Sequence, residues 1–317
     1  MRILIIGAGA VGQSIGCMLA ASGNSVDLIV RERFYEKIRS DGLSVTGILG
    51  DYHVDSGNLG IHLSVESLSD KIFDYALITT KSYDTETAAK ELLKLQKQSF
   101  IVVSMQNGCG NLEIVEKYFG EDRTLGARVI TGFEIAQPGI IKITVTADDI
   151  HVGDYTENGI SNSAEIFAEK LNNAGLPCVT TRYIQRDLLA KLLYNCALNP
   201  LGALLGVHYG ALGDDPDTRD IMNRIIDEVY AVIGAMGAKT HWDTADKYKD
   251  YFYGEQIPAT FNHRPSMLQD LENGKKTEVD ALTGYVSDQG KRFDILTSVC
   301  DILTSLVHFR ERTRIKG

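Results

Sequence analysis

The chain has 317 residues, of which 44% are hydrophobic and 23% are charged, so it is long enough for two ordinary domains with sizeable cores. Its formal net charge of −10 argues against nucleic acids and anionic membrane surfaces as partners. Five cysteines without CxxC spacing and seven scattered histidines predict no disulfide framework and no metal site. We find no run of about 18 uninterrupted apolar residues. We therefore expect a soluble, cytoplasmic protein without a membrane span.

The first half of the chain alternates short apolar runs with amphipathic segments. We expect strands at 3–6, 26–30, 75–79 and 100–104, helices at 11–21, 85–95 and 112–118, a hairpin at 43–54, and later strands at 129–135, 140–145 and 150–152. Strand and helix follow each other with short turns between them. This order predicts an α/β domain with a mainly parallel sheet.

The second half has a different texture. Apolar residues recur at helical spacing over 188–205, 218–236, 243–252 and 293–307, and strand signals are few. We therefore predict two domains, an α/β domain over 1–182 and an all-α domain over 183–317. The apolar helical half leaves room for a homodimer contact.

A glycine motif follows the first predicted strand. Gly7, Gly9 and Gly12 form a GxGxxG pattern, and Ala10 and Val11 lie inside it, where the next helix begins. In a strand–turn–helix context these glycines allow a tight turn, close approach of a pyrophosphate and close helix–strand packing. The free N–H groups of the helix N-terminus then face the phosphates. The motif predicts a dinucleotide site, and a glycine-rich turn that binds nothing is the alternative.

The end of the second predicted strand indicates which dinucleotide binds. An Asp or Glu there would bind the ribose 2′-hydroxyl of NAD, but this chain has Arg31, with Arg33 as a second candidate. A guanidinium can pair with a 2′-phosphate through two hydrogen bonds. We therefore predict NADP(H) as the cofactor; the alternative is a solvated surface arginine.

Three polar residues recur on an apolar helical segment of the second half. Lys191, Asn195 and Asn199 are spaced by four residues and therefore lie near one stripe. An ammonium beside two carboxamides suits a carbonyl substrate, because it can protonate a developing alkoxide while the amides bind oxygens. A snorkelling lysine with capping asparagines is an equally simple explanation of this stretch taken alone.

A third polar stretch lies near the C-terminal end. Ser266 and Asp270 are one helical turn apart, and Glu278 and Asp280 follow after a turn at 273–274. Thr277 is a candidate helix cap. Ordinary capping would explain much of this pattern.

Taken together, these stretches resemble the ketopantoate reductase (2-dehydropantoate 2-reductase) family over nearly the whole chain. The motifs that carry the resemblance are GAGAVG at 7–12, an Arg after the second strand, TKSYD at 80–84, QNG at 106–108, KLLYNCALNP at 191–200 and PSMLQDLENGKKTEVDALTG at 265–284. The resemblance implies a Rossmann-type N-terminal domain and a helical C-terminal domain with the active site in the cleft between them. It also implies reduction of ketopantoate, a small 2-oxo acid, to pantoate with NADPH, on the route to pantothenate and coenzyme A.

The resemblance further assigns roles in the second half. Lys191 matches the general acid that protonates the ketone oxygen, and Glu278 matches a glutamate that binds a substrate hydroxyl at the cofactor junction. Asn195 and Asn199 match active-site amides, and Ser266 matches the serine that holds the substrate end.

In the first half, the resemblance implies a cofactor site made of the glycine motif and three further residues. Lys81 and Asn107 match positions that line the junction of cofactor and substrate, and Arg31 matches the 2′-phosphate contact. The departures from the family pattern are Leu189 in place of a Trp, Tyr209 in place of an Asn, and no Pro in the late segment 296–299.

The same residues are compatible with two other functions. A reductase of a different, branched-chain 2-oxo acid would keep the mechanism and change the substrate. A catalytically silent NADP(H)-binding sensor would need only the first domain, so the presence of Lys191, Ser266 and Glu278 together argues against it.

Overall fold

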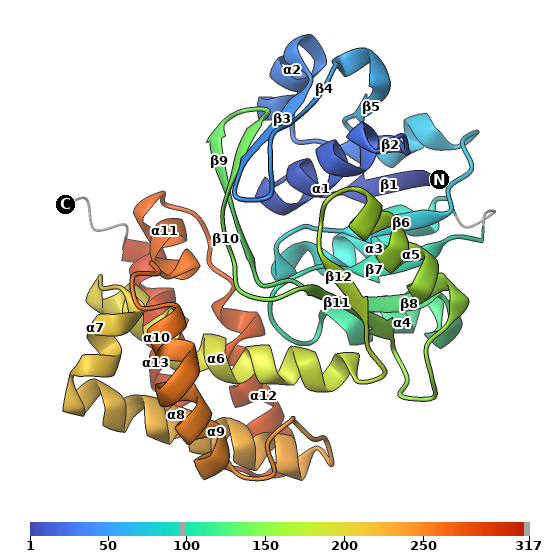
Figure 1. The fold of residues 1–317 in the computed structure, drawn as a ribbon. Helices are drawn as coiled ribbons and strands as arrows, with labels where there is room; N and C mark the ends of the chain where they lie inside the picture. The colour runs from blue at the N-terminus through green and yellow to red at the C-terminus, as the bar shows by residue number, and fades with distance from the viewer. Residues whose placement is uncertain (96–98, 314–317) are drawn as a thin grey trace. The chain divides into compact units, whose positions relative to one another are not determined.

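The computed structural model describes residues 1–95 and 99–313, and the chain divides into two compact units. The N-terminal unit contains residues 1–107 and 111–185. The helical unit contains Gly108–Gly110 and the chain from Arg186 onward. Figure 1 shows strands and helices alternating in the first unit and helices alone in the second.

The main sheet of the N-terminal unit has eight strands within the described residues. From one edge to the other they are β12 (Cys178–Thr180), β11 (Ile150–Asp154), β8 (Thr124–Arg128), β7 (Ile101–Ser104), β6 (Tyr75–Ile78), β1 (Arg2–Ile6), β2 (Ser25–Ile29) and β5 (Leu59–His62). All neighbours pair in parallel except β11 and β8, which pair antiparallel. The predicted, mainly parallel α/β sheet is therefore confirmed.

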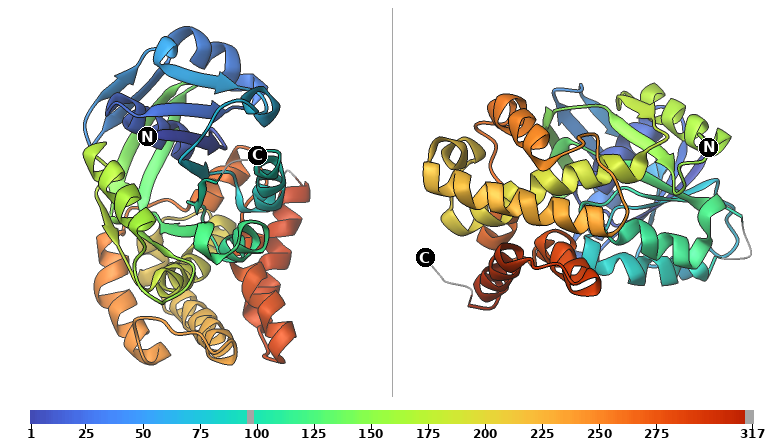
Figure 2. Two further views of the ribbon diagram at one scale, coloured as in Figure 1. Left: turned by 90° about the vertical axis from the view of Figure 1, so that its right-hand side faces the viewer. Right: turned by 90° about the horizontal axis from the view of Figure 1, so that it is seen from below.

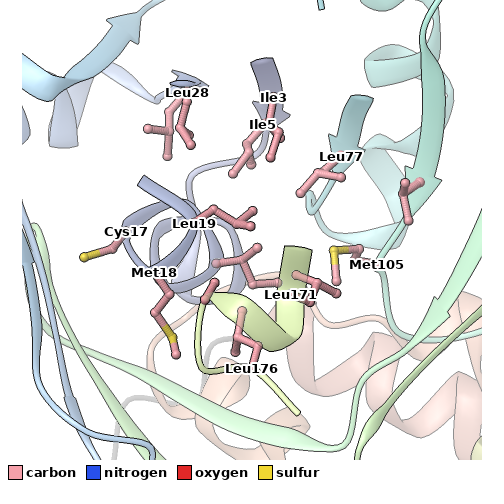
Figure 3. Close-up of a cluster of buried hydrophobic side chains, with 14 of the residues drawn as sticks. Ile3, Ile5, Cys17, Met18, Leu19, Leu28, Leu77, Met105, Leu171 and Leu176 are labelled. Carbon is pink, nitrogen blue, oxygen red and sulfur yellow. The ribbon is translucent and has the colours of Figure 1, made fainter. Parts of the chain in front are cut away.

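Both faces of this sheet are covered, which explains why its strands are almost entirely apolar. Ile3 and Ile5 of β1 point to one face, where Figure 3 shows them near Leu19 and Leu171. Leu4 and Ile6 of β1 point to the other face. The helices that cover the sheet are α1 (Ala10–Ala21) and α5 (Asn162–Asn173) on the first face and α3 (Thr85–Leu93) and α4 (Asn111–Phe119) on the second.

Further elements complete the N-terminal unit. A second sheet has the order β4 (Tyr52–Val54), β3 (Leu43–Gly47), β10 (Ile140–Thr146), β9 (Thr131–Gln137), and its β3–β4 pair is the predicted hairpin. Helix α2 spans Glu32–Asp41, and the short 3₁₀ turns are η1 (Ser56–Asn58), η2 (Val65–Leu68), η3 (Ser82–Asp84) and η4 (Glu121–Arg123).

The strand predicted over 129–135 is confirmed as β9, although it begins two residues later than predicted, and the strand before it, β8, was not predicted. Strand β8 ends at Arg128 and β9 begins at Thr131, and the two belong to different sheets. Strand β8 escaped prediction because its buried sequence TLGAR contains a glycine and an arginine and forms no apolar run. Arg128 is tolerated there because its guanidinium pairs with Asp148 at 2.7 Å.

The helical unit is all-α within the described residues, as predicted. Its elements are α6 (Ile184–Leu205), α7 (Tyr209–Asp214), α8 (Pro216–Ala235), α9 (Ala245–Tyr251), the π-helical turn η5 (Phe252–Gln256), α10 (Ile257–Ala259), α11 (Ser266–Glu272), the 3₁₀ turn η6 (Val279–Ala281), α12 (Thr283–Phe293) and α13 (Ser298–Thr313). The helix predicted over 293–307 is confirmed from Ser298 onward as α13, but its predicted start was wrong. Residue 293 is instead the end of α12, which stops because Asp294 adopts a left-handed conformation with φ of 56°.

Helix α6 is long and strongly apolar. By length and composition alone it could cross a membrane, with a mean hydropathy of 1.3 over its most apolar window. However, 67% of that window is buried inside the protein. The core helix of a soluble protein has the same properties, so burial accounts for the apolar sequence.

Candidate functional site

The residues predicted to bind the cofactor follow the carboxyl ends of adjacent parallel strands. The glycine loop follows β1, and the predicted 2′-phosphate contact follows β2. The corresponding positions after β6 and β7 are Lys81 and Asn107. In open α/β sheets, ligands bind outside the carboxyl ends of the strands, where the strand order reverses. Here that point lies between β1 and β6, so all four positions belong to one edge of the sheet.

Two of the three motif glycines are required by the fold itself. Gly7 has φ of 108°, and a Cβ there would lie 2.5 Å from the backbone nitrogen of Thr80. A Cβ on Gly12 would lie 2.3 Å from the Gly7 carbonyl oxygen and 2.5 Å from the Thr79 hydroxyl. That hydroxyl donates to the Gly7 carbonyl at 2.7 Å, which fixes the loop against the end of β6.

The third motif glycine, Gly9, is not required by packing within the protein. A Cβ on Gly9 would meet nothing within 4 Å, although Gly9 caps the N-terminus of α1. No side chain caps this helix and its first turn carries no acidic residue, so the N–H groups of Ala10 and Val11 begin the helix without an intrahelical acceptor. Open space over bare N–H groups suits a dinucleotide pyrophosphate. The loop therefore fits the cofactor that the sequence predicts.

The difference between Gly9 and Gly12 allows the effect of a substitution on cofactor binding to be measured apart from its effect on stability. We expect Gly9→Ala to keep the melting temperature of the protein and to weaken NADPH binding about tenfold or more, because the methyl group occupies the space of the phosphates. We expect Gly12→Ala to lower stability by about 1–3 kcal/mol through overpacking. Thermal melts and fluorescence titration measure both effects. Unchanged NADPH affinity in Gly9→Ala would contradict a phosphate site at this loop.

Arg31 lies just beyond β2 and caps α2 with its backbone. Its side chain is 61% exposed, and its guanidinium lies 3.2 Å from the Asp84 carboxylate at the end of η3. An exposed ion pair contributes little stability, so the guanidinium can exchange this partner for a phosphate. Arg33, the second candidate, instead stacks on the Phe34 ring at 4.6 Å. The surroundings therefore favour Arg31 over Arg33 as a phosphate contact.

A buried side-chain network that the sequence did not reveal holds the segments of Lys81 and Asn107. The Gln106 amide donates to the Thr80 carbonyl at 3.0 Å and to the Thr85 hydroxyl at 2.8 Å. The Asn111 side chain donates to the Asn107 carbonyl at 2.9 Å. Gln106 is only 6% exposed, and a buried amide must find such partners. The network fixes the backbone on either side of these two positions.

In the helical unit, Lys191, Asn195 and Asn199 lie on α6 at the predicted spacing. The two asparagines are buried, with exposures of 7% and 5%, and the Asn199 amide donates to the Asn195 side-chain oxygen at 3.1 Å. The carbonyl end of the Asn195 amide is thereby occupied. Its N–H₂ end is the part left to donate to a substrate oxygen.

Tyr209 extends this amide chain. Its hydroxyl donates to the Asn199 side-chain oxygen at 2.9 Å, and burial raises the pKa of Tyr209 well above its usual range. The hydroxyl therefore keeps its proton at neutral pH and fixes the orientation of the Asn199 amide. The departure at Tyr209 thus acts through Asn199, and no spacing in the sequence indicates this contact because the two residues belong to different helices.

Removal of the Tyr209 hydroxyl should leave the side-chain amides of Asn199 and Asn195 less firmly oriented. We expect Tyr209→Phe to raise the KM for the 2-oxo acid several-fold and to lower stability by about 1 kcal/mol, because one buried hydrogen bond is lost. Tyr194→Phe is the matched control, since its buried hydroxyl donates to Thr260 instead. It should lose similar stability without changing KM. Equal KM values for the two variants would contradict a positioning role for Tyr209.

The stretch 265–284 divides into structural and candidate residues. Thr277 is fully buried; its N–H donates to Glu311 at 2.7 Å and its hydroxyl accepts from Val279, so it caps η6 as expected. Glu278 is 8% exposed and begins the same turn. Ser266 is the exposed first residue of α11. Burying a carboxylate is costly unless it has a binding partner. The burial of Glu278 therefore suits a role in binding.

Gly108–Gly110 belong to the helical unit although their neighbours belong to the sheet. The Cys109 N–H donates to the Ala281 carbonyl at 2.9 Å, and a Cβ on Gly108 would lie 2.5 Å from the Ala281 side chain. The chain therefore runs directly from Asn107 into a segment that packs on the turn begun by Glu278.

Two of the buried cysteines are unreactive at neutral pH. Burial raises the pKa of Cys17 and of Cys178 to about 12, so neither thiol is a nucleophile at neutral pH. Across residues 1–95 and 99–313, no group of three His, Cys, Asp or Glu side chains is placed to hold a metal ion. His241 pairs with the buried Asp187 at 2.6 Å, one helical turn before Lys191.

Comparison with known proteins gives this arrangement a family. The family model described as ketopantoate reductase PanE/ApbA matches residues 3–157, and the model of its C-terminal region matches residues 183–311. The 2-dehydropantoate 2-reductase of Aquifex aeolicus is 36% identical over 320 aligned residues, covering 100% of this chain and 99% of that protein. The chain belongs to the ketopantoate reductase family. As a member it is an oxidoreductase, and its N-terminal unit is of the Rossmann type.

Solved structures of ketopantoate reductases and their relatives share this fold. The 2-dehydropantoate 2-reductase from Geobacter metallireducens GS-15 has a TM-score of 0.87 and 28% identity, covering 98% of this chain and 99% of that one. A ternary structure of D-mandelate dehydrogenase with NADH and anilino(oxo)acetate has a TM-score of 0.88 and 26% identity, covering 99% of each chain. In the D-mandelate dehydrogenase structure, this fold holds NADH and anilino(oxo)acetate.

Proposed function

We propose that this ketopantoate reductase family member reduces ketopantoate to pantoate with NADPH. The observation that carries the proposal is the buried amide chain from Tyr209 through Asn199 to Asn195, on the same helical stripe as Lys191. Buried amides on the same helical stripe as a lysine suit the binding and protonation of a carbonyl substrate. The activity for which the Aquifex aeolicus relative is named, 2-dehydropantoate 2-reductase, supplies the substrate.

In the proposed mechanism the protein binds and orients the 2-oxo acid and protonates its ketone oxygen. Lys191 donates a proton to the ketone oxygen as that oxygen gains negative charge, so the carbonyl becomes a hydroxyl. Asn195 donates from its amide to a substrate oxygen, Ser266 holds the far end of the substrate, and Glu278 accepts from a substrate hydroxyl. NADPH, when bound, supplies the hydride. Asn199 positions Asn195 and also belongs to the proposed substrate site.

The proposed cofactor site uses the strand edge described above. Its residues are Gly7, Gly9, Ala10, Val11, Gly12, Arg31, Lys81 and Asn107, with Glu278 at the junction with the substrate. An arginine after β2, in place of a carboxylate, supports NADPH over NADH. We propose residues 1–182 as the cofactor domain and residues 183–317 as the substrate domain.

A second candidate follows from the similarity to D-mandelate dehydrogenase, whose ternary structure contains NADH and anilino(oxo)acetate. In that case the same residues would reduce another 2-oxo acid, including a branched-chain one. In either case we propose a cytoplasmic enzyme whose partner is a small 2-oxo acid.

Incubation of the protein with NADPH and ketopantoate tests the proposal. We expect NADPH loss at 340 nm to match pantoate formation, measured by chromatography, in equal amounts. NADPH binding without turnover of any 2-oxo acid would instead favour a catalytically silent NADP(H)-binding sensor.

A further inference from the structure

The last helix, α13, carries an exposed apolar stripe that the proposed function does not use. Ile302, Leu306 and Phe309 are 59%, 46% and 50% exposed. Their spacings of four and three residues place them on one face of the helix. Figure 2 shows α13, the reddest helix, at the edge of the helical unit. Three large apolar side chains in one row are more than scattered surface residues, and such patches mark interaction sites.

The opposite face of α13 is firmly anchored. Cys300, Leu303 and Val307 are buried in the core of the helical unit. The Glu228 carboxylate of α8 accepts from the N–H groups of Val299 at 2.8 Å and of Cys300 at 2.9 Å, which caps the start of the helix.

The far end of α13 is held in the same way. The Glu311 carboxylate accepts from the N–H of Thr277 at 2.7 Å, and His308 contacts Asp280 at 2.8 Å. Because both ends are fixed, the helix presents its stripe rigidly, and little entropy is lost when the stripe binds.

The charges beside the stripe indicate what covers it. Asp301 and Arg312 are 11 residues apart, which is about three turns, so both lie along the same flank of the stripe. Leu306 lies almost midway between them. If a second α13 packs antiparallel with a twofold axis at Leu306, each Asp301 faces the Arg312 of the other copy. The flank of the stripe is therefore complementary to itself in charge.

We propose that α13 pairs antiparallel with α13 of a second copy of this chain, with Leu306 at the twofold axis. Ile302 of one copy packs near Phe309 of the other, and two Asp301–Arg312 pairs close the flank. A single helix pair buries less than a standard interface, so the dimer forms and dissociates with protein concentration.

Sedimentation velocity over a concentration series tests the pairing. We expect the wild-type protein to shift from monomer to dimer as its concentration rises. Leu306→Glu should weaken the dimer about tenfold or more, because two like charges meet at the axis. Ile72→Glu is the matched control, since Ile72 is 62% exposed and lies in the N-terminal unit. A wild-type protein that stays monomeric, or a Leu306→Glu variant that dimerises normally, overturns the proposal.

Cysteine crosslinking tests the orientation. Leu306→Cys should form an intermolecular disulfide on oxidation, because the two thiols meet at the axis. Ile302→Cys should not, because its two copies would be about 12 Å apart along the helices, beyond disulfide reach. Equal crosslinking of both variants indicates a parallel pair and overturns the proposed geometry, as does crosslinking of neither variant.

The charged flank gives an independent test. Asp301→Arg and Arg312→Asp should each weaken the dimer, and the double variant should restore it. Failure of the double variant to recover any affinity contradicts the proposed pairing of these residues.

Discussion

Replacing Lys191 with alanine should lower kcat by about 10²–10⁴-fold, the range that general acid–base groups contribute. NADPH affinity should change by no more than about twofold, because the cofactor cradle of glycines and Arg31 belongs to the other unit. Steady-state kinetics at saturating ketopantoate, with fluorescence titration of NADPH, measure both quantities.

The control for this variant is Lys291→Ala, which removes a 71% exposed lysine of α12. It should leave both turnover and binding unchanged. Wild-type kcat in Lys191→Ala would remove Lys191 from the proposed mechanism. A loss of NADPH affinity equal to the loss of kcat would make Lys191 a cofactor ligand instead of the acid.

Replacing Arg31 with alanine should raise the KM for NADPH about tenfold or more and leave the KM for NADH unchanged. A charge-assisted hydrogen bond contributes about 1.5–3 kcal/mol, and the exposure of Arg31 places the expected effect toward the lower end. The measurement is the KM for each cofactor at low and high salt. The NADPH effect should shrink at high salt, because screening weakens the contact.

Asp84→Asn should act in the opposite direction. It removes the carboxylate 3.2 Å from the Arg31 guanidinium, so NADPH binding should strengthen a few-fold while NADH binding stays the same. If Arg31→Ala weakens both cofactors equally, or neither, the 2′-phosphate does not bind at Arg31.

The sequence predicted the glycine loop well because the motif depends only on local order. A strand, three spaced glycines and a helix are all contiguous, and Gly7 and Gly12 turned out to be fixed by neighbours at the end of β6. Lys191, Asn195 and Asn199 were found for the same reason, since one helix carries all three.

The parts that the sequence missed depend on contacts between distant segments. The Tyr209 hydroxyl reaches Asn199 from another helix, and Gln106 ties together the ends of two strands. No spacing rule encodes such pairs. Helix α2 escaped prediction because its sequence ERFYEKIRSD is mostly exposed and buries only Phe34 and Ile38.

The same limit applies to the sheet strand β8, whose glycine and arginine hide a fully buried strand from a hydrophobicity pattern. Its burial arises from pairing with β7 on one side and β11 on the other, and local hydrophobicity does not report such pairing.

The most direct test of the proposed reaction is the comparison of kcat/KM for ketopantoate and phenylglyoxylate, each with NADPH and with NADH. We expect the ketopantoate–NADPH pair to be preferred over the other three combinations by at least about tenfold, which corresponds to about 1.4 kcal/mol of transition-state discrimination. A preference for phenylglyoxylate with NADH would rule out ketopantoate reduction with NADPH and favour the activity of the D-mandelate dehydrogenase relative.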